Sequence, residues 1–116
     1  MAWHEMKVAP IRQGNTEVVA YEYEDNLSAI GNGDAILIPK GINWFSTTMS
    51  FTAGATGKIQ VTTDTVATVK SETGVTWVDS WWGDADDIYV DLFFPVTAIR
   101  IVQIDTGTMK LTVRAQ

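Results

Sequence analysis

The chain has 116 residues, a mass of 12.8 kDa and no cysteine, so it has the size of one domain and holds neither disulfides nor a cysteine-based metal site. Its net charge is −6 and its pI is about 4.5. Proteins that neutralise phosphates usually carry the opposite charge balance, and no apolar run approaches the ~18 residues of a membrane span. We therefore expect neither nucleic acid nor a membrane as a partner. Residues 1–7 lack the basic and apolar regions of a secretory signal, so we expect no such signal.

The composition predicts an all-β protein. The sequence contains fifteen threonines, twelve valines and ten isoleucines, but only four leucines. Branching at Cβ restricts χ1 and suits a pleated surface better than a helix. We therefore expect strands along most of the chain.

The first seventeen residues differ from the rest. Their apolar side chains follow no regular spacing and belong to Trp3, Met6, Val8 and Ile11. Pro10 and Gly14 interrupt any regular element. Two interpretations remain open, namely a disordered or edge-strand terminus and an arm that docks on a neighbouring subunit. We divide the chain into an extended N-terminal arm (1–17) and a β-sandwich domain (18–116), and we expect the arm to contribute more to assembly than to folding.

Alternating apolar and polar residues predict the strands that follow. In chain order they cover 18–24, 35–38, 44–52, 58–63, 65–71, 75–78, 88–94, 97–104 and 109–115. Residues 26–33 are left open between one helical turn and a loop. The spacing of about eight strands, roughly 8–12 residues apart, favours an antiparallel β-sandwich or a small barrel.

The last strand has the clearest alternation. Its predicted core face carries Met109, Leu111, Val113 and Ala115. A turn at 105–108, where Gly107 is free to take a positive φ, leads into this strand. We therefore predict that residues 97–115 form a hairpin.

No arrangement of residues indicates catalysis. The single histidine, His4, lies in the predicted arm, whereas a catalytic histidine must be held rigidly by a third group. The glycines at 31 and 33 lack the lysine and helix of a phosphate-binding loop. We expect no enzyme activity and no cofactor.

An acidic stretch is the best candidate for a metal site. Asp84, Asp86, Asp87 and Asp91 offer the carboxylate oxygens that calcium prefers. The glycine of this stretch precedes the aspartates, and no glutamate closes the loop. The stretch is therefore interpreted first as a solvated acidic turn, with calcium binding as the alternative, and we expect no metal.

Three tryptophans fall within six residues, at Trp77, Trp81 and Trp82. Exposed on a sheet, such rings stack on sugars, whereas buried rings anchor a core or an interface. Adjacent residues of a strand point to opposite faces, so at least one of Trp81 and Trp82 is predicted to lie outside the main core. Core and subunit interface is the favoured interpretation, and a sugar platform is the alternative.

The final third combines Gly-Val-Thr-Trp at 74–77, Pro-Val-Thr-Ala-Ile-Arg-Ile at 95–101, a glycine-containing turn and a threonine-containing last strand at 109–115. This combination resembles small virion proteins of tailed bacteriophages, in particular capsid decoration (cement) and head-fibre-like proteins. The resemblance covers about 40 residues and is a style of β-structure without a catalytic motif. It implies an Ig-like or jelly-roll-like sandwich, no activity, no cofactor and membership of an oligomer, commonly a homotrimer.

The function expected from this resemblance is structural. The protein would be made in the host bacterial cytoplasm, bind the major capsid protein or another virion subunit, and stabilise the shell. Its candidate interaction residues are Trp3, Met6, Val8, Ile11, Trp81 and Trp82. The alternative is a carbohydrate-binding or host-recognition domain of the tail that uses exposed tryptophans.

Overall fold

The computed structural model describes residues 2–8, 11–13, 16–18, 21–40, 42, 45–52, 54–80, 88–92 and 96–115, with only the backbone for 11–13, 16–18, 45 and 88–92. The described chain is mostly β-structure, in two sheets and a separate hairpin. The hairpin consists of β3 (Ile11–Gln13) and β4 (Thr16–Val18), which pair only with each other.

The first sheet, sheet A, has the order β1-β7-β12-β9-β10, with β6 also paired to β12. Its strands are β1 (Trp3–Glu5), β6 (Gly31–Asn32), β7 (Ala35–Leu37), β9 (Gly57–Thr62), β10 (Val78–Asp79) and β12 (Ala98–Gln103). Only the pair formed by β1 and β7 is parallel; the other pairs of this sheet are antiparallel.

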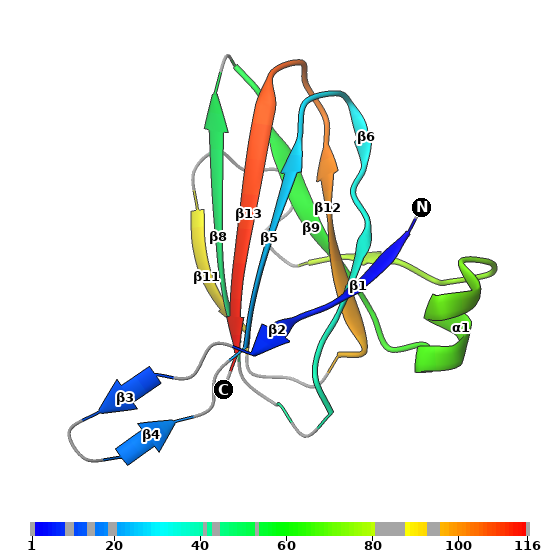
Figure 1. Ribbon diagram of the computed structural model, residues 1–116. Coiled ribbons are helices and arrows are strands. Elements are labelled where there is room, and N and C mark those ends of the chain that lie inside the picture. Colours follow the sequence, from blue (N-terminus) through cyan, green and yellow to red (C-terminus); the bar gives the residue numbers. More distant parts are fainter. Residues whose placement is uncertain are drawn as a thin grey trace.

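The second sheet, sheet B, is antiparallel and has the order β11-β8-β13-β5-β2. Its strands are β2 (Lys7–Val8), β5 (Tyr21–Leu27), β8 (Phe45–Thr52), β11 (Ile88–Leu92) and β13 (Thr108–Ala115). Figure 1 shows sheet B lying in front of sheet A, with the β3–β4 hairpin extending away from both.

The main core lies between the two sheets. Sheet A contributes Ile36, Ile59, Ile99 and Ile101, and sheet B contributes Met49, Met109, Leu111 and Val113, all nearly or fully buried. Strand β13 therefore buries the face that its period-two alternation predicted. Within the described residues, the predicted strands at 35–38, 44–52, 58–63, 88–94, 97–104 and 109–115 are confirmed with small changes at their ends. The predicted strand at 75–78 is wrong except at its last residue, because 75–77 form no strand and β10 starts at Val78.

The predicted hairpin of 97–115 is wrong. Strand β12 belongs to sheet A and β13 to sheet B, so residues 104–107 form an arch between the sheets instead of a turn within one. The buried amide of Gln103 stabilises this arch, because its Nε2 donates to the backbone oxygens of Asp105 (2.9 Å) and Gly107 (2.8 Å). Alternation reveals which face of a strand is buried, but it does not identify the strand beside it.

The predicted strand at 65–71 is also wrong, because this stretch forms the helix α1 (Val66–Ser71). The side chain of Thr65 caps its first turn by accepting from the backbone N–H of Thr68. Of its residues only Val69 is buried. It packs in a second, smaller cluster with Ala35, Leu37 and Ala98, which places α1 over the outer face of sheet A (Figure 1).

The extended N-terminal arm is not confirmed. Strand β1 pairs with β7 in sheet A, and β2 pairs with β5 in sheet B, so residues 3–8 connect both sheets. Between the two strands, Met6 is 8% exposed and belongs to the main core. The domain boundary at residue 17 stays a prediction. Residues 26–33 contain the end of β5 and the short strand β6.

Candidate functional site at the N-terminal segment

Trp3, Met6 and Val8, three of the predicted interaction residues, have different degrees of burial. Trp3 is half-buried against the small cluster under α1, and the ammonium of Lys70 lies 4.6 Å from its ring centroid. Met6 is in the main core, whereas Val8 is 59% exposed. Trp3 and Met6 therefore hold the N-terminal segment to its own domain, and Val8 is the one of the three that faces solvent.

The side chains of the other three predicted interaction residues, Ile11, Trp81 and Trp82, are not placed. Ile11 lies in β3, but its side chain is outside the described residues. Trp81 and Trp82 are outside the described residues altogether, as are Asp84, Asp86 and Asp87. The interface, sugar and calcium interpretations of 81–87 therefore stay predictions.

His4 is held by a contact that the sequence did not reveal. Its Nε2 lies 2.8 Å from Asp34 Oδ2, and the other oxygen of Asp34 accepts the backbone N–H of Ala2 at 3.1 Å. The imidazole also stacks on Tyr23 of sheet B, with ring centroids 5.2 Å apart. Because neighbours along a strand point to opposite sides, Trp3 packs toward α1 while His4 reaches across to sheet B. We call His4, Tyr23, Asp25 and Asp34 the β1 clamp.

The two carboxyl groups of the β1 clamp have opposite pKa shifts. The hydrogen bonds from His4 and from the Ala2 backbone hold the pKa of Asp34 below its ordinary value. Burial, followed by the negative charge of Asp34, raises the pKa of Asp25. Burial and these two carboxylates also raise the pKa of the Tyr23 hydroxyl. In the β1 clamp, the surroundings thus favour the ionised form of Asp34 and disfavour the ionised form of Asp25.

Asp34→Asn should destabilise the protein at neutral pH and have little effect in strong acid. A lowered pKa means that the ionised form stabilises the fold above the ordinary aspartate pKa, and that this stability is lost as pH falls through the lowered value. Since Asp34 is 39% exposed, we expect a loss of about 0.2–1 kcal/mol at pH 7. Urea unfolding at pH 7 and below pH 3 measures this difference. A loss that is equal at both pH values would contradict the role given to the charge.

A hollow of about 280 Å³ lies beside the N-terminal segment, between β1, β5, β7 and α1. Most of its lining is apolar, and it is formed by Glu5, Met6, Tyr21, Leu37, Ile38, Pro39, Lys40, Val66 and Lys70. Val66 is 49% exposed there. Val8 pairs with Tyr21, which lines this hollow, so a second exposed valine lies on the strand beside it.

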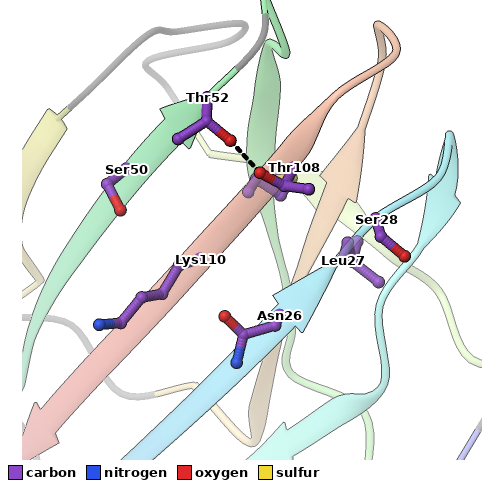
Figure 2. Close-up of a pocket in the computed structure, with 8 residues that line it drawn as sticks. Asn26, Leu27, Ser28, Ser50, Thr52, Thr108 and Lys110 are labelled. Carbon is purple, nitrogen blue, oxygen red and sulfur yellow. Dashed lines mark hydrogen bonds between the residues drawn. The ribbon is translucent and has the colours of Figure 1, made fainter.

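The outer face of sheet B is polar. A hollow of about 320 Å³ lies on this face. Among the residues that line it, Asn26 of β5, Lys110 of β13 and Ser50 of β8 carry polar groups (Figure 2). The hydroxyls of Thr52 and Thr108 hydrogen-bond to each other at its upper end. Lys110 and Arg114 form ion pairs with Glu24 (3.5 Å) and Glu22 (3.3 Å). Such a surface is typical of a solvated sheet face.

Trp77 does not present a free ring face to a sugar. Its ring packs against the small cluster under α1, and the guanidinium of Arg100 lies 4.5 Å from the ring centroid. Arg100 is fixed in turn by its Nε, which donates to Gln60 Oε1 at 2.8 Å. Within the part of the chain whose side chains are described, Trp3 and Trp77 are thus both anchors of this cluster.

Among the side chains that the structure describes, no group of three or more histidine, aspartate or glutamate residues is placed to hold a metal ion. Over the same ranges, no helix has the length and apolar character needed to cross a membrane. In comparisons with known proteins, no family model and no curated protein matches the chain.

Proposed function

We propose that this protein is a non-enzymatic structural protein of a bacteriophage particle, a capsid decoration protein that binds the major capsid protein and stabilises the shell. The observation that carries the proposal is the β3–β4 hairpin, which pairs with no other described strand and extends away from both sheets (Figure 1). This proposal assigns attachment to the hairpin and to the exposed surface at its base.

Strand energetics support an external partner for the hairpin. A two-stranded hairpin is marginally stable in water unless a further strand or layer packs on it. The three paired positions include Ile11 opposite Val18 and Arg12 opposite Glu17. Contact with the shell would supply the packing that no other described strand provides.

The surface at the base of the hairpin supports the same assignment. Val8 and Val66 are exposed at 59% and 49%; Val66 lines the apolar hollow between β1, β5, β7 and α1, and Val8 pairs with Tyr21 of the same lining. Fully burying a valine contributes about 1.5–3 kcal/mol, so partly exposed residues of this kind add a smaller but useful amount each. Many copies on one shell would multiply these modest contacts through avidity.

The finer class of the fold is part of the proposal. We propose an Ig-like or jelly-roll-like sandwich of about eight strands, with the homotrimer that the resemblance implies. Support comes from the two sheets that share one core and from arches that carry the chain between sheets before β9, at 54–56, and before β13, at 104–107. In this proposal the chain is made in the bacterial cytoplasm and ends on the capsid surface.

The double variant Ile11→Ser, Val18→Ser tests the proposal. It should keep the melting temperature within a few degrees of the wild type, because β3 and β4 pair with neither sheet. It should lose most of its binding to undecorated phage heads, measured by co-sedimentation at increasing protein concentration. Val78→Ser is the matched control, since Val78 is 57% exposed but lies on β10.

The two variants give a clear decision. Binding that is retained by Val78→Ser and lost by the double variant supports attachment through the hairpin. Wild-type binding by the double variant would move attachment elsewhere, and wild-type protein that never co-sediments with heads would overturn the decoration function itself.

A further inference from the structure

Asp25 is placed in the β1 clamp with fewer hydrogen-bond donors than an ionised carboxylate can accept. Its Oδ1 accepts the backbone N–H of Asn26 at 3.0 Å, but its Oδ2 is buried without a hydrogen-bond partner. The chain at Gly33 packs directly on this oxygen, since a Cβ atom there would lie 3.0 Å from Oδ2. A buried carboxylate oxygen with no donor is costly in the charged form and much less costly when protonated.

The charges around Asp25 do not compensate for this burial. Asp34, which precedes β7, contributes a second negative charge. The charge of His4 and the backbone N–H groups of Asn26 and Asp34 favour the ionised form of Asp25, but each does so less than burial and the charge of Asp34 disfavour it. Tyr23 lies on the same strand as Asp25. The positive charge of the amino terminus helps to lower the pKa of Asp34. From sheet B, the partner of Asp25 in β13 is the apolar Leu111, whereas Lys110 points to the outer face and pairs with Glu24. From sheet A, β12 contributes Ile101.

We propose that Asp25 is a proton-binding switch that tightens the docking of strand β1 when the solution becomes mildly acidic. Protonation of Asp25 removes its repulsion of Asp34. Asp34 remains anionic and continues to hold His4 and the backbone of Ala2. Through His4 and Met6, the state of Asp25 is transmitted to the segment that joins both sheets and leads to the β3–β4 hairpin.

The direction of the effect follows from proton linkage. Burial, and then the charge of Asp34, raises the pKa of Asp25, so the folded protein binds this proton more tightly than the unfolded chain. The contribution of Asp25 to the free energy of unfolding is therefore fully present below the ordinary aspartate pKa. It is lost as pH rises through the raised pKa. Asp34 acts in the opposite direction at still lower pH, so docking of β1 should be tightest in mild acid.

Asp25→Asn tests the switch, because asparagine resembles the protonated carboxylic acid. We expect this variant to melt several degrees above the wild type at pH 7.5, and the gap to close as pH falls toward 4. Hydrogen exchange of residues 2–8, corrected for the intrinsic pH dependence, should be slower in the variant than in the wild type at pH 7.5 and equal to it near pH 4. Glu24→Gln is the control, since Glu24 is exposed on the same strand and pairs with Lys110.

Each outcome decides the proposal. It is overturned if Asp25→Asn is less stable than the wild type at pH 7.5, if the gap does not change with pH, or if Glu24→Gln shows the same closing gap. If Asp25→Asn fails to fold, the carboxyl carbon of Asp25 in the wild-type protein is titrated by NMR. A midpoint above that of an ordinary aspartate supports the switch, and a midpoint at or below it overturns the switch.

Discussion

Leu111→Ala is expected to lower the free energy of unfolding by about 2–5 kcal/mol, the usual range when a buried leucine is truncated in a close-packed core. Leu111 is fully buried in the main core, at the centre of β13. In the register of sheet B it lies between Met49 of β8 and Asp25 of β5, so its side chain is surrounded by both neighbouring strands. This loss is a large part of the roughly 5–15 kcal/mol that stabilises a domain.

Urea unfolding followed by tryptophan fluorescence measures the effect. Lys110→Ala is the matched control, because Lys110 is the preceding residue of the same strand and points to the outer, polar face. Surface substitutions of this kind usually change stability by no more than about 0.5 kcal/mol. Equal stabilities for Leu111→Ala and the wild type would mean that the core face of β13 has been assigned incorrectly.

Gly107→Ala is expected to destabilise the protein by about 2–6 kcal/mol. Gly107 has a φ of 136°, which alanine adopts only with strain of about 1–3 kcal/mol. In addition, its Cβ would lie 2.5 Å from the backbone oxygen of Thr52 and 2.9 Å from Ala55 Cβ. Backbone atoms cannot move aside as a flexible side chain can. Overpacking of this kind lowers the free energy of unfolding by a further amount of about 1–3 kcal/mol.

Gly31→Ala separates the two contributions. Gly31 has a similar φ of 144°, but no atom lies within 4 Å of the Cβ that would be added. It should therefore show the backbone strain alone, and Gly107→Ala should be less stable than Gly31→Ala in thermal unfolding. If Gly31→Ala is as destabilised as Gly107→Ala, the close approach of the two arches is not what requires glycine at 107.

Local pattern predicted most of the long strands but not which strands pair with them. The alternation around Leu111 depends only on which side of the strand is buried, so it identified β13 and its core face. The partner of a strand depends on contacts far along the chain, and both β8–β9 and β12–β13 cross between sheets instead of pairing. A turn glycine such as Gly107 fits a hairpin and an arch equally well.

The helix was missed for a different reason. Thr65, Val66 and Thr68 have high β-propensity, which hid the capping signal of Thr65 three residues before Thr68. The burial of Val69 over sheet A, where Ala35 and Ala98 leave room, overrides that propensity. Local preference is a weak guide wherever a short amphipathic segment has a sheet face to cover.

The β1 clamp could not be predicted from the sequence. The position of His4 near the chain start argues against a catalytic role and gives no sign of a partner. Its partner, Asp34, is thirty residues away along the chain. A signal did exist in the alternation of Trp3, His4 and Glu5, which places His4 opposite Trp3 on a strand. What the pattern lacked was the parallel pairing with β7, which alone brings Asp34 to His4.

Electron cryomicroscopy of phage heads that carry this protein tests the proposed function most directly. We predict copies on the capsid surface, with the β3–β4 hairpin and the exposed Val8 in contact with the shell. Heads with no copies, or copies attached through another face with the hairpin in solvent, would contradict it.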